Sequence, residues 1–172
     1  MNTTEMNITP HPKLLDMLFA HKSNVCAVFN DVLGLHDVNH IAISWINNNH
    51  ELLSFSSTPA LEFNLFNTNL WRFDKTFQPD WYQLCTQSSW EALYTQDHYD
   101  ELYYIKQAKH QYPLGISLAA NVADNAIIYS IASHKKCQAA REFFAHHYDD
   151  FYKMGEYCTR ELMPLFLHCD QD

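Results

Sequence analysis

Two long apolar runs in the last third of the chain constrain its fold most strongly. Residues 114–122 and 126–132 lie on either side of the short segment Ala123-Asp124-Asn125. Apolar runs of this length that flank a polar turn are typical of two β-strands joined as a hairpin. The chain is therefore expected to build an antiparallel sheet that contains both strands.

A second hairpin is predicted earlier in the chain. Ile41, Ile43 and Trp45 alternate with other side chains, and a β-like run at residues 52–56 follows the turn Asn47-Asn48-Asn49. Asn tolerates the positive φ that tight hairpin turns need, so this segment indicates two further antiparallel strands.

Helical spacing of apolar residues covers most of the remaining chain. It predicts a first helix over residues 12–33 that Gly34 ends, and a last helix over residues 136–162 that ends near Pro164. Between the two hairpins it predicts one helical layer made of short pieces, residues 60–73, 79–85 and 96–108.

This order of elements predicts an α+β fold. Strands that pair mainly as hairpins, with helices before, between and after them, favour a three-layer α/β/α sandwich around a mainly antiparallel sheet. Such an arrangement resembles the PAS and GAF sensor architectures. With 172 residues and 47% hydrophobic content, the chain is expected to form one domain over residues 1–172, with residues 1–10 as a flexible N-terminal tail.

The charge and the apolar pattern exclude several partners. Eleven Lys and Arg against twenty Asp and Glu give a net charge of -9, so a nucleic acid would be repelled. The N-terminus lacks the features of a secretory signal, and no apolar stretch approaches the roughly 18 residues that span a bilayer. We expect a cytoplasmic protein that binds neither nucleic acid nor membrane.

Sequence signals for catalysis are missing. Three glycines cannot form a Gly-rich phosphate cradle, and no nucleophile elbow occurs. Paired carboxylates such as Asp149-Asp150 lie on predicted helix surfaces, where solvation explains them. We therefore expect no enzymatic activity, no catalytic residues and no resident cofactor.

Metal binding is also not expected. The five cysteines are widely separated and include no Cys-x-x-Cys pair, which argues against a disulfide framework and a structural zinc site. Among eleven histidines, His36 and His40 lie in a loop that enters a strand, and the adjacent His146 and His147 point about 100° apart on a helix. A haem or metal sensor remains as an alternative function.

Several local segments resemble the autoinducer-binding domain of LuxR-type quorum-sensing regulators. Asp74 ends the segment Leu70-Trp71-Arg72-Phe73-Asp74, and Trp90 follows at a suitable distance. In the last hairpin, Gly115-Ile116-Ser117-Leu118 is similar to the family's Gly-initiated strand, and Ser130 lies in a segment similar to its terminal strand. The resemblance covers roughly residues 14–161.

The resemblance implies a site for a small amphiphile between the sheet and the helical layer. Asp74 would accept a hydrogen bond from the ligand's amide, Trp90 and to a lesser degree Trp71 would form a wall, and Ser130 would reach the ligand. The ordinary interpretations stay open beside it. Asp74 would then cap a helix, the tryptophans would pack in the core, and Ser130 would bond across the sheet.

The chain departs from the family at several positions. Leu61 and Leu65 stand where ligand-responsive members have Trp and Tyr, and Lys75 stands where the family usually has Pro. The polar anchors for a lactone carbonyl are therefore missing, which argues against the assignment of an acyl-homoserine-lactone-like ligand. The family's DNA-binding helix-turn-helix would begin near residue 165, so direct operator binding is not expected.

The sequence thus predicts a stand-alone small-molecule sensor domain that binds an amphiphilic signal, a partner protein, or both. The family dimerises, so a homodimer or a heterodimer with a regulator is expected, which implies a role in transcription regulation. The alternative is a ligandless protein-interaction module with a filled pocket, in which Leu61 and Leu65 are core residues.

Overall fold

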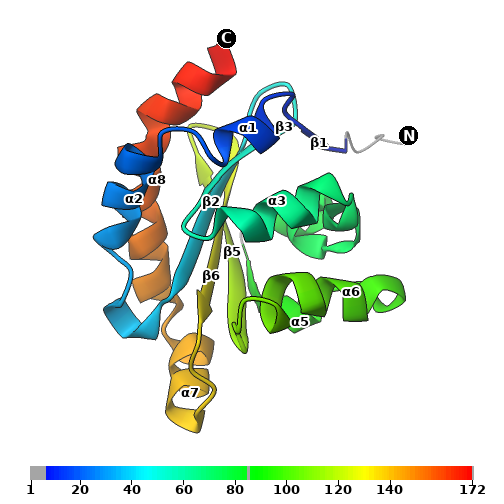
Figure 1. Ribbon diagram of the computed structural model, residues 1–172, viewed down its shortest axis with the longest axis vertical. Helices are drawn as coiled ribbons and strands as arrows, with labels where there is room; N and C mark the ends of the chain where they lie inside the picture. The colour runs from blue at the N-terminus through cyan, green and yellow to red at the C-terminus, as the bar shows by residue number, and fades with distance from the viewer. Residues whose placement is uncertain (1–6, 85, 172) are drawn as a thin grey trace.

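The central sheet of the molecule lies between two layers of helices (Figure 1). The computed structural model describes residues 7–84 and 86–171. Six strands follow the order β1-β3-β2-β6-β5-β4, and every neighbouring pair is antiparallel except the parallel pair β1 and β3. The strands are Thr9–Pro10 (β1), His40–Ile46 (β2), Glu51–Ser56 (β3), Gln87–Ser89 (β4), Leu114–Val122 (β5) and Asn125–Ser133 (β6). The predicted α+β sandwich with a mainly antiparallel sheet is confirmed.

Both predicted hairpins form. In the β5–β6 hairpin, the register runs from Leu114 opposite Ser133 to Val122 opposite Asn125, and the two turn residues have φ of 50° and 68°. In the β2–β3 hairpin, the Asn47 side-chain oxygen accepts hydrogen bonds of 2.9 Å from two backbone N–H groups of the turn. The turn residues therefore supply the backbone conformations that close each hairpin.

The helices divide between the two faces of the sheet. Helices α2 and α8 lie on one side, α3, α5 and α6 lie on the other, and α7 lies at the end of the sheet (Figure 1). The helices are Leu14–Met17 (α1), Lys22–Asn30 (α2), Pro59–Asn67 (α3), Pro79–Tyr82 (α4), Trp90–Leu93 (α5), Tyr99–Tyr103 (α6), Gln138–His146 (α7) and Tyr148–Gln171 (α8). Short 3₁₀ turns cover Leu35–Asp37, Leu70–Phe73, Lys75–Phe77 and Gln96–His98, and a π-helical turn covers Tyr104–Ala108. No helix in residues 7–84 or 86–171 combines the length and the hydropathy that a membrane span requires.

Both long predicted helices differ from the observed ones. The first divides into α1 and α2, because His21 adopts a left-handed conformation with φ of 54°. The last divides at His147, and α8 then continues through Pro164 to Gln171. Proline removes one backbone hydrogen bond, but Phe166 beyond it is fully buried and packs on Phe55 with ring centroids 4.7 Å apart. Tertiary packing therefore holds the helix together past the proline.

The face of the sheet toward α8 carries large apolar side chains. Phe166 of α8 contacts Trp45 and Phe55, and Gly155 of α8 lies against Tyr129 of β6. A Cβ at position 155 would approach the Tyr129 ring to 2.4 Å, so only glycine allows the helix to pack this closely. The buried residues on this face include Ile41, Ile43, Trp45, Leu53, Phe55, Ile127, Tyr129 and Ile131.

The opposite face, toward α3 and α5, carries mostly small or hydroxyl-bearing side chains, together with the buried apolar residues Ile46, Leu52 and Ile128. The small and hydroxyl-bearing residues occupy alternate positions of the same strands and are Ala42, Ser44, Ser54, Ser56, Gly115, Ser117, Ala119, Ser130 and Ala132. We call this face the small-residue face. Ser44 and Ser54 share a hydrogen bond of 3.0 Å across β2 and β3. Small side chains leave depth above the sheet, which residues of the covering helices occupy.

The N-terminal segment differs from its prediction as a flexible tail where it is described. Ile8 is 3% exposed, and Thr9–Pro10 form the edge strand β1. Residues 1–6 of the predicted tail lie outside the described residues. Cys26, Cys137 and Cys158 are free thiols, and Cys85 lies outside the described residues.

Candidate functional site

Asp74 lies at the centre of a buried polar cluster above the small-residue face. Its side chain is fully buried, and one carboxylate oxygen, Oδ2, accepts a hydrogen bond of 2.7 Å from Lys106 Nζ. The other oxygen, Oδ1, accepts a hydrogen bond of 3.0 Å from the Thr76 N–H and so caps the 3₁₀ turn Lys75–Phe77. The Asp74 carboxylate is therefore compensated entirely by groups of the chain itself.

Lys106 reaches Asp74 because of an irregular turn. The π-helical turn Tyr104–Ala108 widens the helix, and it buries two consecutive residues, Lys106 at 2% exposure and Gln107 at 1%. In a regular α-helix, neighbouring side chains point about 100° apart, so both would not be expected on one buried face. Single π-helical turns occur frequently at functional sites.

Trp90 forms a wall of the same cluster. It is fully buried at the start of α5, and its ring lies against Gly115 of β5, where a Cβ would approach it to 2.1 Å. Lys106 Nζ lies 4.4 Å from the Trp90 ring centroid and 5.5 Å from the Tyr94 ring centroid. The ammonium group is thus held by a carboxylate and by two aromatic rings.

Ser130 joins this cluster through the sheet. It is 7% exposed and lies opposite Ser117 in the β5–β6 register. The hydroxyl groups of Ser117 and Thr76 share a hydrogen bond of 3.1 Å, and Thr76 also donates to Asp74. The structure therefore brings Asp74, Trp90 and Ser130 to one interior region, as the resemblance implies. Their role as ligand contacts stays a prediction.

Gln107 connects this region to the adjacent loops. Its amide oxygen accepts a hydrogen bond of 2.7 Å from the Tyr94 hydroxyl, and its amide nitrogen donates one of 2.9 Å to Glu91. Burial, followed by the charges of Asp74 and Glu91, raises the pKa of Tyr94 above its ordinary value of 10.0. Tyr94 therefore remains a neutral hydrogen-bond donor at physiological pH.

A second buried polar group lies beside Trp90. His40 of β2 is fully buried; its Nδ1 lies 3.0 Å from the Thr58 hydroxyl, and its Nε2 lies 3.3 Å from Glu62 Oε1. Burial and the charge of Lys109 lower the pKa of His110 below 6.5, with Glu62 opposing them. Within the described residues, His40 Nε2, Glu62 Oε2 and the Trp90 indole nitrogen have no hydrogen-bond partner.

The remaining predicted site residues lie elsewhere. Leu61 and Leu65 on α3 are each 1% exposed and belong to the apolar core. Trp71 packs against Phe66 with ring centroids 6.5 Å apart and lines a separate surface cleft. Core leucines therefore stand at the two positions where the resemblance would place polar ligand anchors.

Open space lies outside the polar cluster. Three hollows around the described residues have volumes of about 490, 290 and 200 Å³. The largest of these three is lined by residues 7–9, 71–72 and 77–80. Asp74, Trp90 and Ser130 line none of these three hollows.

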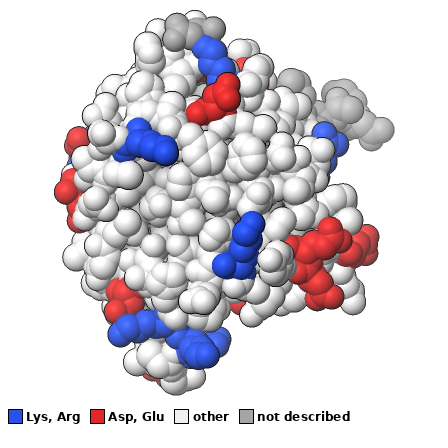
Figure 2. Space-filling model, viewed as in Figure 1, with Lys and Arg blue, Asp and Glu red and all other residues white. Residues whose placement is uncertain are grey.

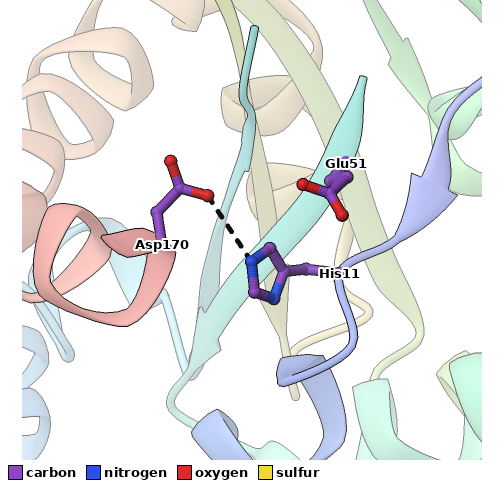
Figure 3. A group of neighbouring side chains, drawn as sticks. All are labelled: His11, Glu51 and Asp170. Atoms are coloured by element: carbon purple, nitrogen blue, oxygen red, sulfur yellow. Dashed lines mark ion pairs between the residues drawn. The ribbon is translucent and has the colours of Figure 1, made fainter. Parts of the chain in front are cut away.

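One group of side chains has the composition of a metal site. His11, Glu51 and Asp170 offer ligand atoms within 4.8 Å of one another, and they are the single such group among residues 7–84 and 86–171 (Figure 3). His11 Nδ1, however, accepts a hydrogen bond of 3.1 Å from the Lys13 N–H. A neutral imidazole that accepts at Nδ1 carries its proton on Nε2, which is the atom that faces Asp170 at 3.5 Å.

This group is better explained as a structural link. Asn47 is 4% exposed, and its amide donates to Glu51 Oε1 at 3.1 Å and to Asp170 Oδ1 at 2.7 Å. The same side chain also closes the β2–β3 turn. His11, Asn47, Glu51 and Asp170 therefore tie the N-terminal segment, the hairpin and the end of α8 together. The histidines singled out in the sequence, His36, His40, His146 and His147, do not belong to this group.

Sequence reasoning missed the residues that close the interior. Lys106, Gln107, His40 and Glu62 are buried polar or charged residues, but each lies in a segment whose pattern also fits an exposed helix or strand end. Asp74 and Lys106 are 32 residues apart. Only the three-dimensional arrangement shows that they meet.

Comparison with known proteins supports the fold alone. No protein-family model and no curated protein sequence matches the chain. A crystal structure of Escherichia coli SdiA, a LuxR-type regulator, matches with a TM-score of 0.57 and 10% sequence identity over 82% of this chain. SdiA in complex with octanoyl-rac-glycerol matches with a TM-score of 0.54 and 8% identity over 88% of this chain.

The chain spans about three fifths of the SdiA chains, 61% and 62% respectively. The two likenesses agree with the element order and with the resemblance to LuxR-type regulators found in the sequence. We conclude that the fold of the chain is similar to that of the matched part of SdiA.

Proposed function

We propose that this domain is a regulatory protein-interaction module of the LuxR-like sensor fold, with an interior closed by its own side chains. The observation that carries this proposal is the ion pair of 2.7 Å between Lys106 and Asp74, both at most 2% exposed. The ammonium group of Lys106 takes the hydrogen-bond position on Asp74 that the resemblance gives to a ligand amide. A ligand is then not needed to pair Asp74.

Energetics support a closed interior. A ligand amide that displaced Lys106 would exchange a charged donor for a neutral one and would leave the ammonium buried without its partner. Breaking a buried ion pair costs about 3–5 kcal/mol. Leu61 and Leu65 add apolar core where lactone-responsive relatives carry polar anchors. An acyl-homoserine lactone is therefore a poor occupant of this interior.

The proposed module acts in the cytoplasm without catalysis and without a cofactor, as a homodimer or as a heterodimer with a regulator. The net charge of -9 supports a protein partner over a nucleic acid. Acidic side chains gather on the face shown in Figure 2, over the region of α6, where Asp100 and Glu101 lie in the first turn. A regulator with a basic surface fits this charge distribution.

Native mass spectrometry of the purified chain after extensive desalting tests the closed interior. We expect the mass of the polypeptide alone or of its oligomer, because no molecule is enclosed. An added mass of a few hundred daltons that leaves only on unfolding would contradict the proposal. The same spectra report the oligomeric state.

The second candidate function is that of an amphiphile sensor. One observation favours it, the fold similarity to SdiA in complex with octanoyl-rac-glycerol. Incubation with octanoyl-rac-glycerol before desalting separates the two functions. An enclosed ligand is retained through desalting. It also raises the melting temperature, because at a hundredfold excess over its Kd it increases the free energy of unfolding by about 2.7 kcal/mol. A closed interior retains nothing.

A further inference from the structure

Three exposed tyrosines lie together on α6 and at the start of the π-helical turn that follows it. Tyr99, Tyr103 and Tyr104 are 36%, 40% and 58% exposed, and the rings of Tyr99 and Tyr103 stack with an interplanar angle of 9° and centroids 6.4 Å apart. Tyr94, which is buried, meets the Tyr99 ring edge-on at 5.4 Å and so holds it from the interior side. We call the three exposed residues the tyrosine face. Tyr is enriched at protein interfaces because its ring is large and rigid and its hydroxyl group stays polar.

Carboxylates surround the tyrosine face. Asp97, Asp100 and Glu101 are all exposed, and acidic side chains gather over the region of α6 (Figure 2). In the described part of the chain, Asp97 and Asp100 make no ion pair, and the partner of Glu101 is His98, at 3.1 Å. The negative charge beside the tyrosines is therefore largely uncompensated.

The fold does not supply a cation from the same segment. Within residues 76–108, Lys106 is the only Lys or Arg in the sequence. It is 2% exposed and is paired with Asp74, so it does not neutralise the surface. Partial desolvation, followed by nearby negative groups that include Glu91 and Asp100, raises the pKa of Tyr99 above its ordinary value of 10.0. The field around this ring thus favours a positive charge from outside the chain.

From these observations we propose that the tyrosine face is the docking surface for an arginine-containing basic segment of a partner protein. Guanidinium groups of the partner stack on the rings of Tyr103 and Tyr104, and their N–H groups donate to Asp97 and Asp100. Arg fits better than Lys, because its planar group is weakly hydrated, stacks on aromatic rings and pairs with a carboxylate through two hydrogen bonds.

The inference rests on the proposed function and deepens it by naming the chemistry of the partner. A second copy of this chain is a poor occupant of the tyrosine face, because each copy carries a net charge of -9 and the two would repel each other. The face lies outside the Asp74–Lys106 interior, so a partner can dock without opening the core.

Fluorescence anisotropy of a labelled peptide of alternating Arg and Ala, titrated with the full chain at physiological salt, tests the docking surface. We expect saturable binding, and a Kd at least about fivefold higher for the matching peptide of Lys and Ala, because Lys lacks the stacking and the bidentate pairing. The Tyr103→Leu/Tyr104→Leu double variant should raise the Kd of the Arg peptide about tenfold. Tyr104→Leu alone, at the most exposed of the three positions, should raise it about threefold and serves if the double variant fails to fold.

Matched controls separate the face from the general charge of the protein. Phe19→Leu removes an aromatic ring that is 41% exposed elsewhere on the surface, and it should leave the Kd unchanged. Asp100→Asn should raise the Kd about threefold, because it removes an exposed carboxylate beside the rings. Asp149→Asn makes the same change in net charge at an exposed position in the first turn of α8, and its Kd should equal that of the wild type.

Several results overturn the assignment. They are no saturable binding, equal Kd values for the Arg and Lys peptides, and equal effects of Asp100→Asn and Asp149→Asn, which would show attraction by net charge alone. A lower oligomer mass in the tyrosine double variant would assign the face to contact between copies of the chain. A molecule retained through desalting contradicts the closed interior without affecting the tyrosine face, whereas loss of peptide selectivity contradicts the docking surface and leaves the closed interior standing.

Discussion

The two faces of the central sheet solve the problem of burial in different ways. Toward α8, large apolar residues such as Tyr129 and Phe55 fill space directly, and Phe166 and Gly155 of the helix fit against them. Toward α3 and α5, the small-residue face leaves depth that Trp90, Lys106 and Gln107 fill from the covering segments. The first face is a conventional apolar core, whereas the second includes a polar interior beside buried apolar residues such as Ile128.

Substitutions on the two faces are expected to have different effects. An apolar core depends on volume, so substitutions there act on stability. A polar interior depends on every donor and acceptor having a partner, and each unpaired group is costly. In this chain, Lys106 supplies the partner of Asp74, whereas His40 Nε2, Glu62 Oε2 and the Trp90 indole nitrogen have no hydrogen-bond partner among the described residues.

Adjacent residues of β3 give the sharpest contrast between the two faces. Phe55→Ala should lower the free energy of unfolding by about 3–5 kcal/mol, because it opens a cavity under Phe166. Ser54→Ala should lower it by about 1 kcal/mol, because it removes the hydrogen bond to Ser44. Urea denaturation measures both. Equal losses would remove the distinction between the faces.

The two packed glycines test close approach on each side. Gly115→Ala and Gly155→Ala should each destabilise the fold by about 1–3 kcal/mol, because the new Cβ meets the ring of Trp90 or Tyr129. Gly115→Ala should also shift the fluorescence of the buried Trp90, whereas Gly155→Ala should not. Gly34→Ala should destabilise the fold for a different reason. Gly34 has open space around it, so the new Cβ meets no side chain, but its φ of 95° disfavours Ala. An unshifted fluorescence spectrum in Gly115→Ala would contradict the placement of Trp90.

The smallest expected effect is a pH dependence at the edge of the polar interior. The pKa of His110 is lowered below 6.5, so the unfolded chain binds more protons than the folded chain between that lowered pKa and pH 6.5. Stability should therefore fall as the pH drops from 7 through this window. His110→Gln should reduce the slope of melting temperature against pH. An unchanged slope in this variant would assign the dependence to other groups.

The sequence predicts the apolar face of the fold well and the polar interior poorly. Alternating residues such as Ile41, Ile43 and Trp45, and the turn residues Asp124 and Asn47, specify both hairpins through local chemistry. The resemblance to LuxR-type regulators places Asp74, Trp90 and Ser130 in one region, and their role as ligand contacts stays a prediction. These features depend on periodicity and on segments close in the sequence.

The Asp74–Lys106 pair could not be predicted in this way. Lys106 is buried only because a π-helical turn reorients it, and hydrophobic periodicity assumes regular helices. The continuation of α8 past Pro164 has a similar origin, because it depends on the burial of Phe166. Tertiary contacts decide both, and neither leaves a local signal.

A double-mutant cycle on Asp74 and Lys106 tests the central claim most directly. Free energies of unfolding are measured for the wild type, Asp74→Asn, Lys106→Met and the double variant. Lys106→Met alone should cost about 3–5 kcal/mol, because it leaves a buried carboxylate without its cation. The double variant should recover much of that loss, with a coupling energy of about 2–3 kcal/mol. A coupling energy within about 0.5 kcal/mol of zero would show that the two side chains act independently, and would contradict an interior closed by this pair.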